Sequence, residues 1–138
     1  MRRLILDTHC FLSAVAAHAH GRETALARSW QDFRTRELGL VFGETLLLEI
    51  QRVLDYPSVA RLGISAGTAF TAATELLLLG GYWAPVPATS WPTLSDRNDW
   101  HLFDLLYHTG ADALVTRDAQ VLKAGRTLGL PVISPQEL

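Results

Sequence analysis

Short apolar runs alternate with longer segments of helical periodicity along most of this chain. Five of these runs are bounded by turn-forming or polar residues, which is typical of buried strands. We expect strands at residues 3–7, 38–42, 82–86, 113–116 and 131–134.

The segments between these runs predict helices. Ala27, Trp30 and Phe33 recur at roughly helical spacing in one of them. Ser65 can cap another, and Pro57 can stop the helix that precedes it. Gly21 and the glycine pair at 80–81 are also placed to end helices. We expect helices at residues 10–18, 23–36, 43–56, 65–79, 99–109 and 119–124.

Strands that alternate with helices favour an α/β fold in which a parallel sheet is covered on both faces. The length of 138 residues suits one domain, so we expect residues 1–138 to fold as a single unit. In such folds, ligands bind beyond the carboxyl ends of the strands, near a switch in strand order. Asp7 and Asp118 each follow a predicted strand, so we expect them at the same edge of the sheet.

Helix geometry at 100° per residue sorts the remaining acids. With Leu46 at 0°, Glu49 falls near about 300°, on the border of the apolar stripe, and Glu44 near about 160°, on the far side. With Asp99 at 0°, the apolar residues of its helix lie within about 60°, whereas Asp104 lies near about 140°. We therefore expect Glu49 and Asp99 to face inward and Asp104 to be solvated, as we expect for Asp112.

Four acids remain as candidates: Asp7, Glu49, Asp99 and Asp118. Each has an ordinary alternative, since Asp7 and Asp118 could be helix N-caps, Asp99 could serve a helix dipole and Glu49 could border solvent. Together, four nearby carboxylates would repel one another and raise each other's pKa unless a cation joined them. Mg²⁺ or Mn²⁺ takes oxygen ligands and binds phosphate on its open side, so the set indicates a divalent-metal site suited to phosphodiester hydrolysis.

Composition limits the partners and the compartment. A net charge of −2 is not the basic footprint of a protein that coats nucleic acid, so any attraction to a polyanion must be local or carried by bound cations. Cys10 is the single cysteine and fits a reducing compartment. The first twenty residues imitate a secretion signal, but Asp7 and His9 interrupt the apolar stretch. No run has the length of a membrane span, so we expect a cytoplasmic protein.

Three segments resemble the PIN-domain nucleases, and in particular bacterial PIN proteins similar to VapC-type toxins. "LILDTH" is similar to the family's opening strand, which ends in Asp-Thr-Asn. "LLLEIQRVLDYP" resembles the helix that bears the family's glutamate, and "NDWHLFDLLYHTGADALVTRDAQVL" resembles its closing segment. The resemblance implies a three-layer α/β/α sandwich around a central, mostly parallel sheet of four to five strands.

The resemblance also implies roles for single residues. It gives Asp7, Glu49, Asp99 and Asp118 to a site for Mg²⁺ or Mn²⁺. Thr116 would orient a carboxylate or water, and Thr8, which matches the threonine of the opening motif, would lie next to the ligands. It implies single-stranded RNA as the substrate and often a protein partner, an antitoxin, that blocks the site. Where the family has asparagine, this chain has His9. We expect His9 to pack or to hydrogen-bond near the site rather than to bind the metal directly.

Other residues leave alternatives open. Arg97 and Arg117 flank predicted site residues, and each could hold an RNA phosphate or lie free in solvent. Trp91 and Trp100 could stack on bases, although covering the core is the commoner role. His101 and His108 fall on the polar side of their predicted helix, and we assign no role to either. The leucine run at 76–79 permits a homodimer or partner surface.

Two rival functions remain. A PIN-like scaffold without catalysis could bind RNA or a partner protein, and His9 leaves room for it. A receiver-like signalling domain would need paired acids at the first strand and a lysine on a late strand. Asp7 stands alone and Lys123 lies in a predicted helix, so this second rival fits the sequence poorly.

Overall fold

The computed structural model describes residues 1–79 and 81–138 and contains a single parallel sheet. Its strands run in the order β3-β2-β1-β4-β5, and every neighbouring pair is parallel. This confirms the expected α/β fold with a central sheet of four to five strands. The strands are β1 (Arg2–Leu6), β2 (Leu38–Phe42), β3 (Tyr82–Trp83), β4 (Ala113–Val115) and β5 (Val132–Ile133).

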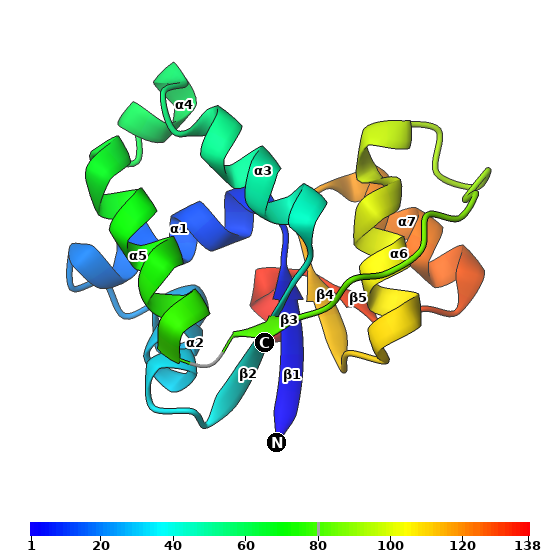
Figure 1. Ribbon diagram of the computed structural model, residues 1–138, viewed down its shortest axis with the longest axis horizontal. Coiled ribbons are helices and arrows are strands. Elements are labelled where there is room, and N and C mark those ends of the chain that lie inside the picture. Colours follow the sequence, from blue (N-terminus) through cyan, green and yellow to red (C-terminus); the bar gives the residue numbers. More distant parts are fainter. Residues whose placement is uncertain (80) are drawn as a thin grey trace.

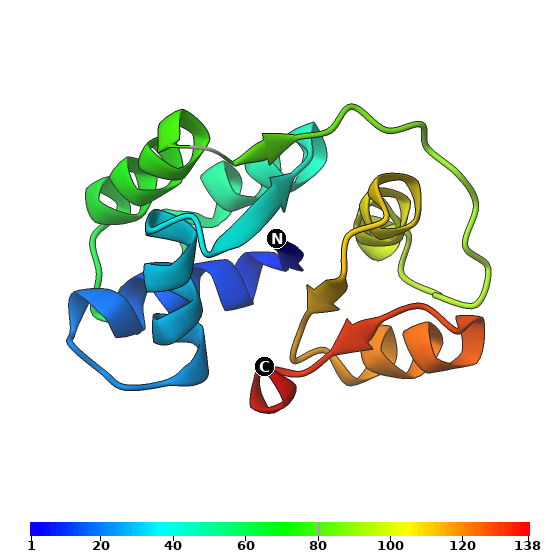
Figure 2. The same cartoon turned by 90° about the horizontal axis from the view of Figure 1, so that it is seen from below.

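Helices cover both faces of this sheet, which gives the three-layer sandwich (Figures 1 and 2). Helices α1, α2 and α5 lie on one side and α6 and α7 on the other, while α3 approaches α6 beyond the strand ends. The helical elements are α1 (Thr8–Ala19), α2 (Ala25–Arg34), α3 (Glu44–Val53), α4 (Pro57–Ala60), α5 (Ala66–Leu79), η1 (Arg97–Asp99), α6 (Trp100–Thr109), α7 (Ala119–Leu128) and η2 (Pro135–Glu137).

The element boundaries differ from the prediction at several helix ends and at β3, which is Tyr82–Trp83 instead of residues 82–86; the short helix α4 was not predicted. Helix α7 runs to Leu128, beyond the expected end at Ala124, and stops at Gly129 in a left-handed conformation. The expected stop of α5 falls on Gly80, which lies outside the described residues. The hydroxyl of Ser65 accepts from the backbone N–H of Thr68 over 3.1 Å, as a helix cap should.

The core is apolar and continuous beneath the site. Phe11, Phe42 and Phe103 are among the largest fully buried side chains. Phe11 packs edge-on against both Trp30 and Phe42, with ring centroids 5.5 and 6.1 Å apart. This packing fixes α1 against β2, so the start of α1 is held rigidly at the carboxyl edge of the sheet.

The strand order places a switch point between β1 and β4. From β1 the chain moves outward through β2 to β3, and then it returns to pair β4 with the other side of β1. Leu6 is the register partner of Val115, so the residues that follow these two strands emerge side by side. This is the place where open parallel sheets bind their ligands.

The segment between β3 and η1 covers the outer side of α6, and it corrects the prediction for Asp104. Asp104 is only 5% exposed. Its Oδ1 accepts from the backbone N–H of Thr89 (3.0 Å), from the Thr89 hydroxyl and from the indole of Trp91 (2.8 Å). The expectation of a solvated carboxylate was wrong because α6 buries two faces, one against the sheet and one under this segment. Asp112 is exposed, as expected.

The two tryptophans of this region support the segment. The Trp91 ring packs edge-on against Phe103, with centroids 5.7 Å apart. The indole of Trp100 donates to the carbonyl of Leu94 over 2.7 Å. Both side chains therefore hold the segment to α6, which is the covering role.

Candidate active site

All four predicted acids line one cavity of about 390 Å³ at the carboxyl edge of the sheet. Asp7 follows β1 and Asp118 begins α7, while Glu49 comes from α3 and Asp99 from the end of η1. Residues distant in sequence thus meet at the switch point between β1 and β4. The cavity is lined by Asp7, Thr8, His9, Ser13, Glu49, Asp99, Leu102, Arg117, Asp118 and Val121.

Thr116 connects two of the acids. It is fully buried, and its hydroxyl donates to Oδ2 of Asp7. The same hydroxyl accepts from the backbone N–H of Asp118 over 3.1 Å. Asp7 also caps α1, because its Oδ1 accepts from the N–H of Cys10 over 2.7 Å. Both oxygens of Asp7 therefore have protein donors, which fixes the direction of the carboxylate.

Asp118 is also a helix cap, and it keeps one oxygen free of protein donors. Its Oδ1 accepts from the N–H groups of Gln120 (2.9 Å) and Val121 (3.3 Å). Among the described residues, no hydrogen bond reaches Oδ2. The ordinary capping roles of Asp7 and Asp118 are thus real, and for Asp118 capping leaves an oxygen available to a ligand.

Glu49 is held by His101, for which sequence patterns predicted no role. Nε2 of His101 donates to Oε2 of Glu49 over 2.9 Å and joins α6 to α3. This hydrogen bond is the main cause that holds the pKa of Glu49 below its usual value; burial acts against it, and Thr8 and Arg52 assist. Glu49 is therefore ionised at neutral pH.

Asp99 is the acid of the four whose charge the folded protein disfavours. It makes no capping hydrogen bond, and the cap of η1 is supplied by Asp96, whose Oδ1 accepts from Asn98. Burial raises the pKa of Asp99 to about 6, and repulsion from Asp96, Asp118 and Glu49 adds to the rise. The mutual repulsion expected for these acids is thus present at Asp99, and a cation would relieve it.

The raised pKa predicts how stability depends on pH without divalent cations. Because the folded pKa of Asp99 exceeds the ordinary 3.8, its stabilising contribution is complete below 3.8 and is lost as pH rises through about 6. Two pKa units correspond to about 3 kcal/mol, which solvent screening of this half-exposed group reduces to roughly 1 kcal/mol. Relative to that of wild type, the free energy of unfolding of Asp99→Asn should therefore rise by about 1 kcal/mol between pH 4 and pH 7. Urea unfolding in EDTA at both pH values measures this, and a constant difference would contradict it.

The donor chemistry fits a hard divalent cation. Every acid at the cavity offers carboxylate oxygen, and oxygen is what Mg²⁺ and Mn²⁺ prefer. The buried Thr8 hydroxyl, also at this cavity, makes no hydrogen bond of standard geometry, although it lies near enough to Glu49 to lower that pKa. A bound cation or its water would supply the missing partner.

The acids line the cavity without converging on a point. Within residues 1–79 and 81–138, no three His, Cys, Asp or Glu side chains are close enough to share an ion. Mg²⁺ keeps several waters and often takes only one or two carboxylates directly, so binding does not require a closed cage of three. The carboxylate oxygens are suitable ligands for the ion. If the acids move closer together, they would do so when the ion binds.

Basic residues stand at two sides of the site. Arg117 lines the acid cavity and donates to the Ser13 hydroxyl over 3.1 Å. Arg97 lies outside that cavity, over the ring of Trp100 at 5.5 Å. His9 lines the cavity but is exposed, which contradicts a packing role. Among the described residues, no hydrogen bond of His9 is formed.

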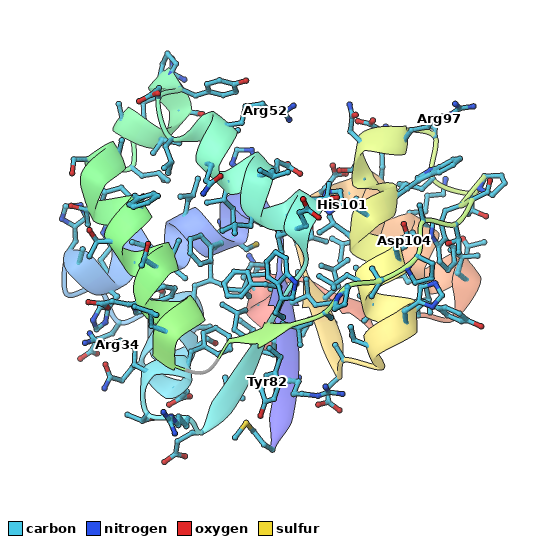
Figure 3. The ribbon with its side chains drawn as sticks, in the orientation of Figure 1. Arg34, Arg52, Tyr82, Arg97, His101 and Asp104 are labelled. Atoms are coloured by element: carbon cyan, nitrogen blue, oxygen red, sulfur yellow. The ribbon has the colours of Figure 1, made fainter. Side chains whose placement is uncertain are left out.

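Arg52 and His101 are functional candidates that sequence reasoning missed. With Arg97, they line a second cavity of about 300 Å³ that shares Glu49 with the first. In Figure 3, Arg52 and Arg97 extend from opposite sides of the space between α3 and α6, and His101 lies between them. Arg52 stands one helical turn from Glu49, a spacing that could have indicated it.

Comparisons with known proteins agree with this architecture. Residues 3–120 match the family model described as the PIN domain. The crystal structure of PAE2754 from Pyrobaculum aerophilum superposes with a TM-score of 0.58, covering 99% of this chain and 85% of that one. Its sequence identity of 19% shows a shared fold and no more. A search of curated proteins found no significant match.

The family match covers the whole site. All four acids of the cavity fall within residues 3–120, as does Thr116. PIN domains are generally nucleases and typically use divalent metal ions, so the match indicates a nuclease-type hydrolase. With the fold and the position of the acids in agreement, the chain belongs to the PIN-domain family.

Proposed function

We propose that this protein is a Mg²⁺- or Mn²⁺-dependent ribonuclease that hydrolyses phosphodiester bonds of single-stranded RNA. The observation that carries the proposal is the single cavity at the sheet switch point lined by four acids, one of which, Asp99, has a pKa raised partly by its neighbours. Such a site is unfavourable alone and suits a divalent cation beside a phosphate.

Each side chain has a task in this proposal. Asp7, Glu49, Asp99 and Asp118 would hold the metal, which when bound lowers the pKa of water and neutralises charge on phosphate oxygens. Thr116 fixes the carboxylate of Asp7 so that it does not rotate away from the site.

Local charge explains how an acidic protein could bind RNA. The net charge of −2 gives no general attraction to a polyanion. Arg117 at the acid cavity, and Arg52 and Arg97 at the neighbouring one, provide a short basic path that a flexible strand can follow. A duplex presents its phosphates on a stiff cylinder, so we expect single-stranded RNA to bind better.

The direct test is cleavage of a labelled single-stranded RNA by purified protein. We expect cutting with Mn²⁺ or Mg²⁺, none with EDTA, and less cutting of duplex RNA or of a DNA of the same sequence. Products should carry a 5′-phosphate and a 3′-hydroxyl, because water is the proposed nucleophile. Metal-independent cutting, or 2′,3′-cyclic phosphate products, would contradict the proposal.

A second candidate is a PIN scaffold that binds RNA without cutting it. It is favoured by the lack of a converged set of three ligands among the described residues and by the hydrogen bond that engages Glu49. Calorimetric titration with Mn²⁺ separates the two candidates. Mn²⁺ binding by wild type that is lost in Asp99→Asn supports the nuclease. No Mn²⁺ binding, together with an RNA affinity that added Mn²⁺ does not change, supports the scaffold.

A toxin role with an antitoxin partner, a homodimer and a cytoplasmic location remain part of the proposal. Leu78 is 80% exposed on α5, while the side chains of Leu76, Leu77 and Leu79 lie outside the described residues. No helix among the described residues is long and apolar enough to span a membrane. A small antitoxin gene beside this one would support the toxin role.

Replacing Thr116 with valine should separate carboxylate positioning from packing. Valine keeps the volume but removes the donor to Asp7 and the acceptor for Asp118, so we expect a stability loss of about 1–3 kcal/mol. We also expect a roughly 10- to 100-fold loss of cleavage, the order seen when a partner of a metal ligand is removed. Thr116→Ser keeps the hydroxyl and should retain most activity. A larger loss in Thr116→Ser than in Thr116→Val would show that packing matters and the hydroxyl does not.

A further inference from the structure

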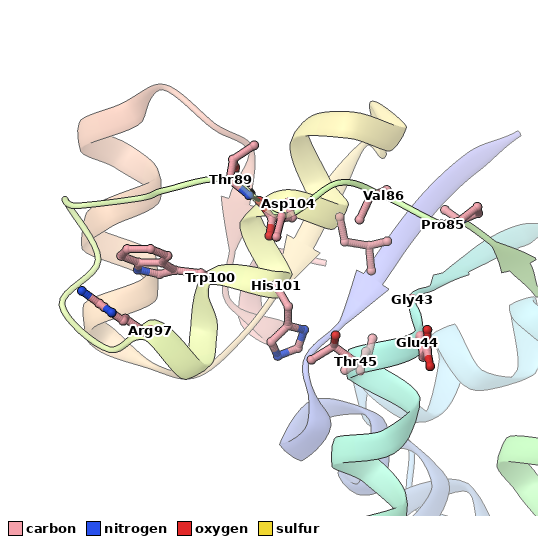
Figure 4. Close-up of a pocket in the computed structure, with 14 residues that line it drawn as sticks. Gly43, Glu44, Thr45, Pro85, Val86, Thr89, Arg97, Trp100, His101 and Asp104 are labelled. Atoms are coloured by element: carbon pink, nitrogen blue, oxygen red, sulfur yellow. Dashed lines mark hydrogen bonds between the residues drawn. The ribbon is translucent and has the colours of Figure 1, made fainter.

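A cavity with apolar walls beside the acid site has no part in the proposed chemistry. It measures about 570 Å³ and lies between the start of α3, the segment 84–89 and α6 (Figure 4). Leu46, Pro85, Val86 and Leu105 provide apolar walls. This volume and lining are those of a site for a small organic group with a few fixed polar contacts.

Asp104 provides the buried polar contact in this cavity. All three of its hydrogen bonds, two from Thr89 and one from Trp91, end on Oδ1. In the part of the chain that the structure describes, no donor reaches Oδ2. Asp104 lines the cavity, and its Oδ2 is free to accept a hydrogen bond from a group bound there.

The cavity is linked to the acid site through shared walls. His101, Arg97 and Thr45 line both this cavity and the smaller one beside it. That smaller cavity in turn shares Glu49 with the acid cavity. A strand whose phosphate sits at the acids could therefore place a neighbouring nucleotide beside Asp104.

The charges decide which part of a nucleotide enters. Glu44 and Asp104 both line the cavity and disfavour a phosphate there. Arg97 stands at the side shared with the smaller cavity, where a phosphate would remain. The apolar walls and the free Oδ2 of the buried Asp104 suit a base that presents an amino group.

We propose that this cavity is a base-recognition site in which Oδ2 of Asp104 accepts a hydrogen bond from the exocyclic amino group of an unpaired base, such as N4 of cytosine. The inference rests on the proposed function, because it deepens the substrate choice of the same enzyme. Uracil has the acceptor O4 where cytosine has its amino donor, so it would face the carboxylate with an unpaired oxygen. The protein therefore prefers amino-bearing bases to uracil next to the cleaved bond.

Asp104→Asn tests the proposal by exchanging one atom. The amide oxygen can keep the three donors from Thr89 and Trp91, and the NH₂ group then takes the place of Oδ2. An acceptor becomes a donor, and the preference should invert. We expect wild type to cut short oligocytidine about 10-fold faster than oligouridine of the same length, and Asp104→Asn to prefer oligouridine.

The matched control is Asp55→Asn, which changes an exposed carboxylate away from these cavities and should keep the wild-type preference. Binding supplies a second readout that does not need cleavage. Fluorescence anisotropy of labelled oligocytidine and oligouridine is measured with Asp99→Asn alone and combined with Asp104→Asn.

The outcomes separate this inference from the proposed function. Cleavage of both oligonucleotides at equal rates overturns the base site and leaves the nuclease standing. Cytidine-selective binding without cleavage by wild type keeps the base site and refutes the nuclease. Equal affinities, or no binding of either oligonucleotide by Asp99→Asn, overturn the base site whether or not the double variant folds.

Discussion

Replacing Asp99 with asparagine should remove metal-dependent RNA cleavage while leaving the fold intact. The carboxylate makes no capping hydrogen bond, so its loss deprives no backbone group of a partner. Its pKa of about 6 shows that the folded protein disfavours its charge when no cation is present. A carboxylate whose charge destabilises the metal-free protein, and which three other acids repel, is best explained by a cation that it binds.

The expected loss of cleavage rate is about 10²- to 10³-fold, the order found when one preorganised electrostatic contact to the reacting group is removed. In EDTA at neutral pH the variant should be as stable as wild type or slightly more so, because repulsion from Asp118 and Glu49 is relieved. Added Mn²⁺ should raise the melting temperature of wild type more than that of the variant, since a ligand stabilises the state that it binds.

Asp55→Asn is the matched control and should match wild type in both measurements, because Asp55 is exposed and lies away from the acid cavity. A large fall in melting temperature with retained cleavage would show that Asp99 serves structure instead. Equal stabilisation of both proteins by Mn²⁺ would remove Asp99 from the metal site.

The sequence carried enough information for the sheet and for the meeting of the acids. A parallel strand leaves its last side chains at one edge, so Asp7 and Asp118 could be placed from the apolar runs before them. Helical phase then selected Glu49 over Glu44, and it is Glu49 that lines the acid cavity. These inferences need only local periodicity and the geometry of a helix or strand.

Contacts made by irregular segments and by a second helix could not be predicted in this way. Helical phase assumes one buried face, but the segment between β3 and η1 has no periodicity and covers a second face of α6, where Asp104 lies. His101 was placed on the polar side of its helix, yet α3 approaches that side and brings Glu49 within 2.9 Å. Such pairings depend on how two elements cross, which no single-element pattern records.

Replacing Asp104 with leucine should destabilise the protein strongly. Leucine has a similar size but no acceptor, so the N–H and hydroxyl of Thr89 and the indole of Trp91 would lose their shared partner, the buried carboxylate of Asp104. A hydrogen bond to a charged group contributes about 1.5–3 kcal/mol, and water can replace part of the two that the exposed Thr89 makes, so we expect a loss of roughly 3–5 kcal/mol for the three together. For a domain of this size we expect a fall in melting temperature of about 10 °C or more.

Asp104→Asn should cost far less, because the amide oxygen can still accept all three hydrogen bonds. Thr89→Ala gives a further check, since it removes the hydroxyl donor that Asp104→Leu leaves without an acceptor. Thr89→Ala should therefore lower stability less in the Asp104→Leu background than it does in wild type. Equal stability of the leucine and asparagine variants, or strict additivity of the pair, would mean that the segment is held by its apolar contacts alone. If instead the losses follow the hydrogen bonds, one carboxylate both fixes the segment through Oδ1 and leaves Oδ2 to the cavity. The wall of the base site and its selectivity would then depend on the same residue.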